Sequence, residues 1–245
     1  MAQYQYSTTF QAYTTASNEA SAQRIVGLVH DWLAVSSVAD FGCGQGVWLG
    51  AWLAAGITDL QGVDGDYVDR GALRIPTQQF FATDLAQPVD LARTFDLVSC
   101  LEVAEHLPAT AAPTLLATLA RHGDILLFSA APPGQGGEHH VNEQPYAWWR
   151  DRLAALGYEL FDCVRPRVAD DHAVQAWYRY NVFLYARGAG LARLPDSVKI
   201  SHIPAHAPIP DVSPLPYRLR KELVKRIPPA LADRLARAKA KLARG

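Results

Sequence analysis

Short apolar runs alternate with amphipathic stretches along most of the chain, and the two kinds of segment predict different elements. Seven apolar runs are four to seven residues long, and several lead directly into glycine or an acidic residue, which is typical of buried strands. These predicted strands cover residues 38–41, 60–63, 79–82, 95–101, 125–129, 158–164 and 180–186.

Apolar residues at helical spacing lie around and between these strands. Residues 16–33 place Ile25 and Val29 on one face and predict a leading helix. The other predicted helices are 47–55 and 146–156, each ended by glycine, the crossover segments 66–73, 89–93 and 109–121, which suit helices or their remnants, and a short helix around Val174. This alternation predicts an α/β fold: a doubly wound, mostly parallel seven-stranded sheet with helices on both faces. Ligands of such sheets bind beyond the carboxyl ends of the strands.

The pattern changes after about residue 187, and we expect a first domain over residues 1–190. Six prolines fall within residues 194–216, which predicts an extended linker over residues 191–216. Residues 217–245 predict a basic amphipathic tail of two helices, 217–227 and 229–243. The first has Leu219, Leu223 and Ile227 on one face, so we expect it to pack on the body or on a second subunit, with its basic face able to approach anionic lipid.

Composition restricts the protein to a few classes. Its 49% hydrophobic and 19% charged residues are typical of a globular protein with a core, and no apolar run approaches the roughly 20 residues that span a bilayer. The first ten residues lack the pattern of a signal peptide, so we expect a cytoplasmic protein without a transmembrane segment. Cys43, Cys100 and Cys163 lie beside or within apolar runs, which is typical of buried free thiols in a reducing compartment.

Charge is distributed unevenly. The net charge is −1, but the tail from Tyr217 to Gly245 has ten basic and two acidic residues, so the rest of the chain carries −9. The acidic body argues against nucleic acid as a partner, although the tail could contact an anion.

Three glycines follow the first predicted strand at every second position: Gly42, Gly44 and Gly46, directly after Asp40. Glycine lets the backbone adopt positive φ and approach a ligand closely. A dinucleotide fingerprint would have the spacing G-x-G-x-x-G, and Asp40 would repel a diphosphate, whereas a carboxylate suits a ligand with ammonium and sulfonium groups. The stretch from Asp40 to Gly46 resembles the first motif of the class I S-adenosylmethionine-dependent methyltransferases, which implies a Rossmann-like fold and that cofactor.

Further matches to this family follow at the ends of the next strands. Asp64 ends the second strand, where an acid can accept hydrogen bonds from ribose hydroxyls, and the resemblance places Asp84 and Leu85 beside the adenine. Residues 95–107 resemble the fourth-strand motif, whose backbone near Cys100 and Leu101 would meet the methionine part. Taken singly, Asp64 and Asp84 could also be turn-forming acids or helix caps.

The acceptor chemistry is expected after strands four and five. Glu102, Glu105 and His106 form the pattern Glu-x-x-Glu-His, and His140 follows in the next loop. This set resembles the divalent-metal site of small-RNA 2′-O-methyltransferases and ubiquinone-pathway O-methyltransferases, in which Mg²⁺ or Mn²⁺ would lower the pKa of an acceptor hydroxyl. Without a metal, His140 or His106 would be the general base, with Glu105 beside it, and the two glutamates could equally shape the cofactor pocket or cap a helix.

Taken together, these features predict methyl transfer to a hydroxyl of a small molecule, a sugar or glycan or a secondary metabolite. Trp177 and Arg179 could line the acceptor pocket, where Arg179 would pair with a phosphate or carboxylate. Two alternatives stay open. One is an RNA 2′-O-methyltransferase that grips phosphates with its tail, and the other is an inactive cofactor-binding protein that serves as an interaction partner.

Overall fold

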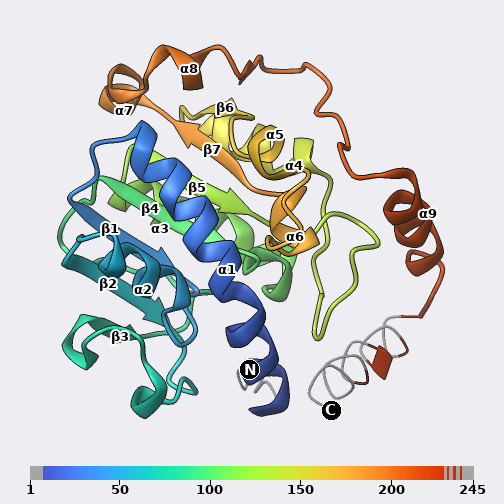
Figure 1. The fold of residues 1–245 in the computed structure, drawn as a ribbon, viewed down its shortest axis with the longest axis horizontal. Helices are drawn as coiled ribbons and strands as arrows, with labels where there is room; N and C mark the ends of the chain where they lie inside the picture. The colour runs from blue at the N-terminus through green and yellow to red at the C-terminus, as the bar shows by residue number, and fades with distance from the viewer. Residues whose placement is uncertain (1–7, 229–230, 232–233, 236–237, 239–245) are drawn as a thin grey trace.

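A twisted sheet organises the protein in the computed structural model, which describes residues 8–228, 231, 234–235 and 238, with side chains from Asn18 onward (Figure 1). Within these residues the sheet has eight strands in the order β3-β2-β1-β4-β5-β7-β6-β8. The strands are β1 (Ser37–Phe41), β2 (Asp59–Asp64), β3 (Phe80–Ala82), β4 (Leu97–Leu101), β5 (Ile125–Ser129), β6 (Glu159–Phe161), β7 (Phe183–Ala186) and β8 (His202–Ile203).

Strands β1 to β5 are parallel to one another, while β7 is antiparallel to both β5 and β6. The mostly parallel α/β sheet is therefore confirmed. The expected number of seven strands was too low, because β8 pairs antiparallel with β6 at the edge. β8 has only two residues, too few to produce an apolar run in the sequence.

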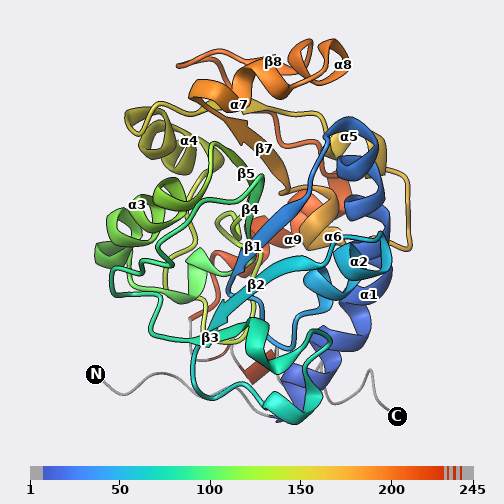
Figure 2. The same ribbon diagram turned by 90° about the vertical axis from the view of Figure 1, so that its left-hand side faces the viewer.

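Helices cover both faces of the sheet (Figure 2). The α-helices are α1 (Thr8–Trp32), α2 (Val47–Ala54), α3 (Ala112–His122), α4 (Tyr146–Ala155), α5 (Arg165–Val168), α6 (Ala176–Arg179), α7 (Gly188–Arg193), α8 (Asp196–Lys199) and α9 (Leu215–Val224), and the short 3-10 helices are η1 (Arg70–Ala72), η2 (Thr77–Gln79), η3 (Ala104–His106) and η4 (Ala109–Ala111). α1 and α2 lie on one face, and α3 and α4 on the other.

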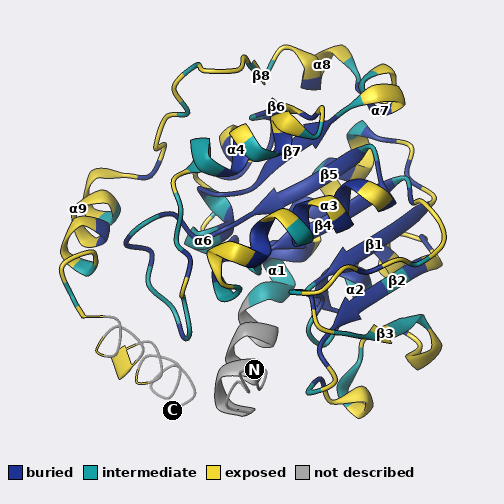
Figure 3. Cartoon of the chain, turned by 180° about the vertical axis from the view of Figure 1, so that it is seen from behind, coloured by how far each residue is buried: buried dark blue, intermediate teal, exposed yellow. Residues whose placement is uncertain are grey.

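The core consists of two apolar clusters, one on each side of the sheet. Neighbouring residues of one strand belong to different clusters: Val38 packs with the α1 and α2 side, and Ala39 with the α3 and α4 side. This alternation follows from the two-residue period of a strand. Every residue of β1, β4, β5 and β7 is buried (Figure 3), as expected for strands covered on both faces.

Several crossover segments are less regular than the sequence predicts. Residues 66–73 contain only η1, and residues 89–93 contain no helix, whereas 109–121 forms η4 and most of α3. Val174 lies in a turn between α5 and α6 rather than in a helix. The crossovers between β2, β3 and β4 are thus almost without helix, and β3 is correspondingly only partly buried.

The core continues beyond Arg187, where the sequence predicts its end. Leu194 and Val198, from the end of α7 and from α8, are buried in the same cluster as α1. The segment predicted as an extended linker therefore contributes helix α8 and strand β8, and only residues 204–214 run without helix or strand. The high density of prolines correctly indicated that this segment has no long helix or strand. It does not exclude short elements that pack against the core.

Helix α9 confirms the first predicted tail helix, but not the face by which it packs. Leu219 and Leu223 are 56% and 65% exposed, whereas Lys221 is buried against the body. The second tail helix, predicted over 229–243, lies mostly outside the described residues. Within the described part of the chain, none of the helices is both long and apolar enough to cross a membrane.

Candidate functional site

The carboxyl ends of β1 to β4 open into a cavity of about 1250 Å³. The loops that follow these strands form one side of it. The other side comes from loop 130–145, from α6 before β7, and from α9. The cavity thus lies at the sheet edge where the sequence predicts ligand binding.

The glycine turn after β1 lets the backbone itself form part of the cavity wall. Gly42 has φ +85°, and a Cβ on it would be 2.3 Å from a methyl of Val103, so no other residue fits there without a shift. Gly44 has φ +53° and no neighbouring atom within 4 Å of a Cβ position, because it faces the open cavity. Gly46, at φ +78°, is the N-cap of α2 and does not line the cavity.

Asp64, at the end of β2, connects the glycine turn to the next loop. Its carboxylate accepts hydrogen bonds from the Gly44 amide at 2.7 Å, the Gly65 amide at 2.6 Å and the Tyr67 hydroxyl at 2.5 Å. Burial raises the pKa of Asp64, while these three donors lower it. A carboxylate at this place, on the cavity wall, can accept from a polyhydroxylated ligand.

Asp40 lies beneath the cavity rather than on its wall. Ser99 donates a hydrogen bond of 2.6 Å to one carboxylate oxygen, and the other oxygen is buried without a partner. Burial raises the pKa of Asp40 to about 7. Asp40 therefore belongs to the sequence motif but does not line the cavity.

Asp84 and Leu85 both line the cavity after β3. Asp84 is exposed and its carboxylate accepts from the Ala86 amide at 2.9 Å, so it also has the turn-forming role considered from the sequence. Leu85 is buried and offers an apolar surface beside it. At the end of β4, Leu101 lines the cavity, whereas Cys100 points into the core among Phe41 and its neighbours.

Glu102 is held by an amide network instead of facing the other predicted metal ligands. Gln135 donates to one of its carboxylate oxygens at 2.5 Å, and Asn181 donates to the other at 3.4 Å. Tyr146 completes the network through a hydrogen bond of 2.8 Å to Asn181. Burial raises the pKa of Glu102, and its backbone has φ +56°, a conformation that non-glycine residues rarely adopt.

Glu105, His106 and His140 come together on the cavity wall, with ligand atoms within 4.8 Å of one another. The imidazole rings of His106 and His140 are edge to face at 4.8 Å. Both carboxylate oxygens of Glu105 are buried without a hydrogen-bond partner among the described residues. Burial and the nearby Glu102 raise the pKa of Glu105 well above its usual range.

The two histidines differ in the hydrogen-bond partner of their Nδ1 atoms. His106 contacts the His139 carbonyl through Nδ1 at 3.2 Å, and burial followed by the nearby His140 lowers its pKa well below the usual value. His140 is paired through Nδ1 with the Glu143 carboxylate at 2.8 Å. Burial alone would raise the pKa of Glu143, but His140 and the Gly134 and Gly136 amides lower it.

This arrangement provides the elements of a proton-accepting or cation-binding site. An imidazole whose Nδ1 bonds a carboxylate presents Nε2 as its acceptor nitrogen. A buried carboxylate without donors and two imidazoles are also ligands suited to a divalent ion. Of the four predicted metal ligands, the structure gathers these three and leaves Glu102 in the amide network.

Comparison with known protein families is consistent with this geometry. A family model described as a methyltransferase domain matches residues 13–162, more than half of the chain. The chain belongs to the class I S-adenosylmethionine-dependent methyltransferases. S-adenosylmethionine is therefore the methyl donor of this methyltransferase.

One relative with an assigned reaction aligns with part of the methyltransferase. A ubiquinone biosynthesis O-methyltransferase from Ralstonia nicotianae is 30% identical over 152 residues, which are 58% of this chain and 57% of that protein. The aligned part thus spans less than two thirds of that relative, and its substrate does not transfer to this chain.

Solved structures confirm the fold. The methyltransferase domain of bacterial CtHen1-C has a TM-score of 0.53 at 18% identity, covering 70% of this chain and 99% of that one. Magnesium protoporphyrin IX methyltransferase from Synechocystis, with bound S-adenosylmethionine, has a TM-score of 0.51 at 21% identity over 76% and 86% of the two chains. A sugar N-methyltransferase from Streptoalloteichus has a TM-score of 0.52 at 19% identity over 71% and 87%.

Several cavity residues of the methyltransferase escaped the sequence analysis. Tyr67 and Trp48 are aromatic residues next to predicted cofactor positions, a signal that could have identified them. Gln135 was only one polar residue of a long loop. Tyr217 belongs to the tail that the sequence placed apart from the site.

Proposed function

We propose that this methyltransferase transfers a methyl group to a hydroxyl oxygen of a small molecule, a sugar or glycan or a secondary metabolite. The observation that carries the proposal is the group of Glu105, His106 and His140 on the wall of the cavity. In-line displacement breaks the methyl–sulfur bond, whose electron pair stays on sulfur, and forms a methyl–oxygen bond as the hydroxyl proton leaves. A hydroxyl acceptor therefore requires a proton acceptor, and an imidazole supplies one.

Cofactor binding is assigned to the residues that follow β1 to β4. The Gly42 and Gly44 backbone would lie against the methionine part, with Leu101, and Asp64 would accept from the ribose. Asp84 and Leu85 would flank the adenine. Their common position on one end of the cavity supports this assignment, and Asp40, Gly46 and Cys100 would act from behind the wall through backbone placement.

His140 is the base that the contacts favour. Its Nδ1 is paired with Glu143, whose lowered pKa keeps it ionised, and a carboxylate in this position stabilises the imidazolium that forms when Nε2 takes a proton. The depressed pKa of His106 keeps that imidazole neutral, so it can accept a hydrogen bond or act as the base itself. Glu105 would orient the acceptor hydroxyl beside them.

The same group fits a divalent ion. Glu105, His106 and His140 would hold Mg²⁺ or Mn²⁺, and the unpartnered carboxylate of Glu105 is the feature that supports this. A bound divalent ion acts as a Lewis acid that lowers the pKa of a coordinated hydroxyl. The ion would then offset the free-energy cost of burying the Glu105 carboxylate, because it would take the place of the missing hydrogen-bond donors.

Release of S-adenosylhomocysteine from a panel of sugar, nucleotide-sugar and phenolic acceptors, with and without chelator, tests the proposal. We expect turnover with at least one hydroxyl acceptor and a large loss in His140→Ala. Turnover that is insensitive to chelator would leave the imidazole as base and remove the metal. Turnover only with amine acceptors would contradict O-methylation.

Cofactor assignment has a separate test. Asp64→Ala removes the acceptor for three donors at the cavity wall, so we expect loss of measurable S-adenosylmethionine binding in calorimetry. Asp59→Ala, an exposed acid at the start of β2 paired with Arg93, is the control and should bind normally. Near-normal affinity in Asp64→Ala would contradict the assignment.

The alternative is that RNA is the acceptor, because the basic tail could bind its phosphates. A salt-sensitive affinity for RNA that is lost on deleting residues 217–245 would favour it. Cofactor binding without turnover on any acceptor would favour the inactive interaction protein.

A further inference from the structure

Two arginines line the cavity on elements that contribute none of the predicted cofactor residues. In the sheet, β1 to β4 provide the cofactor end, whereas β7 lies beyond β5. Arg179 ends α6, just before β7, and Arg220 lies on α9, and both line the cavity. These elements are therefore available to contact an acceptor when the loops after β1 to β4 hold the cofactor.

The two guanidinium groups stand on one continuous aromatic surface. The Arg179 guanidinium lies 5.3 Å from the ring centre of Tyr180, and the Tyr180 and Tyr217 rings are 5.3 Å apart. The Arg220 guanidinium in turn lies 5.7 Å from the ring centre of Tyr217. The tail and the body therefore meet at two tilted tyrosine rings, each with a guanidinium group beside it.

Neither arginine has an acidic partner among the described residues, although most other arginines of the body do. Ion pairs to aspartate or glutamate hold Arg24, Arg70, Arg74, Arg93, Arg121, Arg150, Arg165, Arg187 and Arg193. Arg179 instead contacts His172 at 3.2 Å, and its Nε is buried without a partner. Arg220 donates to the Gln135 carbonyl at 2.9 Å.

Unused guanidinium donors at a cavity wall match the geometry of carboxylate or phosphate oxygens. Such charge-assisted hydrogen bonds are the strong ones in proteins, and a buried donor without an acceptor is costly. An anion bound here would satisfy Arg179 and neutralise two charges that no side chain of the described chain neutralises.

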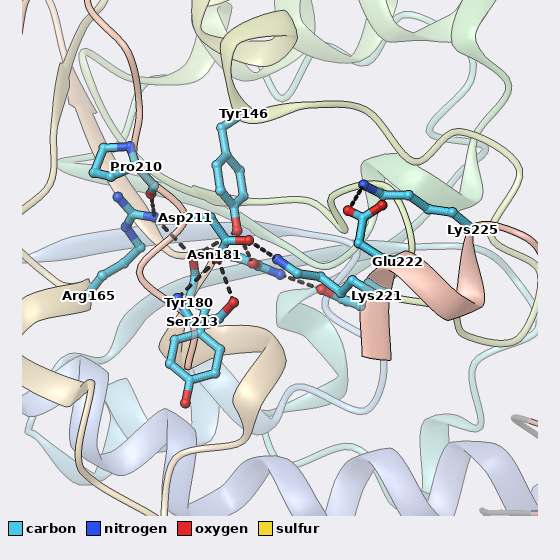
Figure 4. Close-up of polar contacts among 11 residues, drawn as sticks. Tyr146, Arg165, Tyr180, Asn181, Pro210, Asp211, Ser213, Lys221, Glu222 and Lys225 are labelled. Carbon is cyan, nitrogen blue, oxygen red and sulfur yellow. Dashed lines mark hydrogen bonds and ion pairs between the residues drawn. The ribbon is translucent and has the colours of Figure 1, made fainter. Parts of the chain in front are cut away.

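Helix α9 is also held against the body by an ion pair (Figure 4). Buried Lys221 pairs with Asp211, which also accepts from Ser213. α9 lies so close to loop 130–145 that a Cβ on Gly134 would be 2.2 Å from the Lys221 carbonyl oxygen. The tail is thus a wall of the site rather than a separate appendage.

We propose that the acceptor carries an anionic group, a carboxylate or a phosphate, bound by Arg179 and Arg220, with its apolar part against Tyr217. This inference rests on the proposed function, because it takes the cavity wall outside the loops after β1 to β4 as the acceptor site. It narrows the acceptor to an anionic hydroxyl compound.

Phenyl phosphate, benzoate and benzyl alcohol test the inference, because they share a ring and differ in charge. Each is titrated by calorimetry into protein saturated with S-adenosylhomocysteine. We expect at least one of the two anions to bind the wild type, and benzyl alcohol to bind at least tenfold more weakly. Which anion binds more tightly distinguishes a phosphate from a carboxylate.

Variants assign the effect to the arginines. Arg179→Gln and Arg220→Gln should each weaken the anion at least tenfold while S-adenosylhomocysteine affinity stays within twofold. Arg218→Gln is the matched control, since Arg218 is exposed on the same helix and does not line the cavity. Equal binding of the anions by all variants, or no anion binding to the loaded wild type, overturns the inference. Failure of S-adenosylhomocysteine itself to bind would instead contradict the cofactor assignment.

Discussion

At the scale of single residues, Asp40 shows how a motif position can act without touching the ligand. Burial raises its pKa from 3.8 to about 7, so the folded state without cofactor holds a proton that the unfolded state releases between these values. Stability from Asp40 is thus fully present below about pH 4 and is lost as the pH rises through about 7. A shift of this size corresponds to roughly 4 kcal/mol at most.

Asp40→Asn should remove this pH dependence while keeping an acceptor for Ser99. In urea denaturation of the protein without cofactor, we expect the variant to match the wild type near pH 4 and to exceed it by a few kcal/mol at pH 8. Ser99→Ala, which removes the hydrogen bond but keeps the carboxyl group, is the comparison and should keep the pH dependence. Parallel stability curves for Asp40→Asn and the wild type would show that Asp40 does not titrate in this range.

Gly42 provides a second prediction at this scale. Gly42→Ala combines positive φ with a Cβ only 2.3 Å from Val103, so we expect a loss of about 2–4 kcal/mol in unfolding free energy and weaker cofactor binding. Gly56→Ala shares a positive φ of +94° but meets no atom within 4 Å. It should lose only about 1 kcal/mol. Equal losses in the two variants would mean that the Val103 contact is unimportant.

The candidate residues could be predicted where strand ends determine them. Gly44, Asp64 and Leu101 reach the cavity because parallel strands end at one edge of the sheet. The Cys100 side chain points into the core instead, because neighbouring strand residues point to opposite faces, and the predicted backbone contact at Cys100 stays a prediction. Which face of β4 meets the cavity depends on the packing of α3 and α4, and the motif alone does not show it.

At the scale of elements, α9 packs through a buried ion pair although its leucines indicate an apolar interface. Asp211→Asn removes the carboxylate partner of buried Lys221, so we expect α9 to open more often from the loop beside it. Hydrogen exchange of the α9 amides should accelerate at least tenfold, and cofactor affinity should stay unchanged.

Glu222→Gln is the control for this prediction. Glu222 lies on the same helix, and its carboxylate pairs with Lys225 on the exposed side, so its loss should leave exchange unchanged. Similar exchange in Asp211→Asn and the wild type would indicate that the ion pair between Asp211 and Lys221 does not hold α9.

Elements were predictable in proportion to their length and periodicity. Strands β1, β2, β4 and β5 and helix α2 lie within a residue or two of the predicted bounds. α9 was recognised from its spacing, but periodicity describes an apolar face without showing what covers it. Lipid contact through its basic face and subunit contact through its leucine face stay predictions, and Leu219 and Leu223 are exposed on that second face.

At the scale of the whole molecule, the core extends through α8 into the segment predicted as a linker. Val198→Ala should destabilise the protein by about 1–3 kcal/mol in thermal or urea unfolding, because Val198 is fully buried against the α1 side of the core. Ile200→Ala, two residues later and 88% exposed, should change stability by less than about 0.5 kcal/mol. A negligible effect of Val198→Ala would restore the boundary near Arg187.

The sequence alone determined the α/β class, the mostly parallel sheet, the glycine turn and the family, because these follow from local periodicity and short motifs. Tertiary structure decided which side chains meet: Arg220 reaches Gln135 from 85 positions away, and Glu102 pairs with amides instead of joining Glu105 and the histidines. Such contacts depend on how the chain closes over the sheet edge. Buried Lys221 pairs with Asp211, and α9 lines the cavity. No local sequence pattern predicts this contact, because its partners come from separate segments.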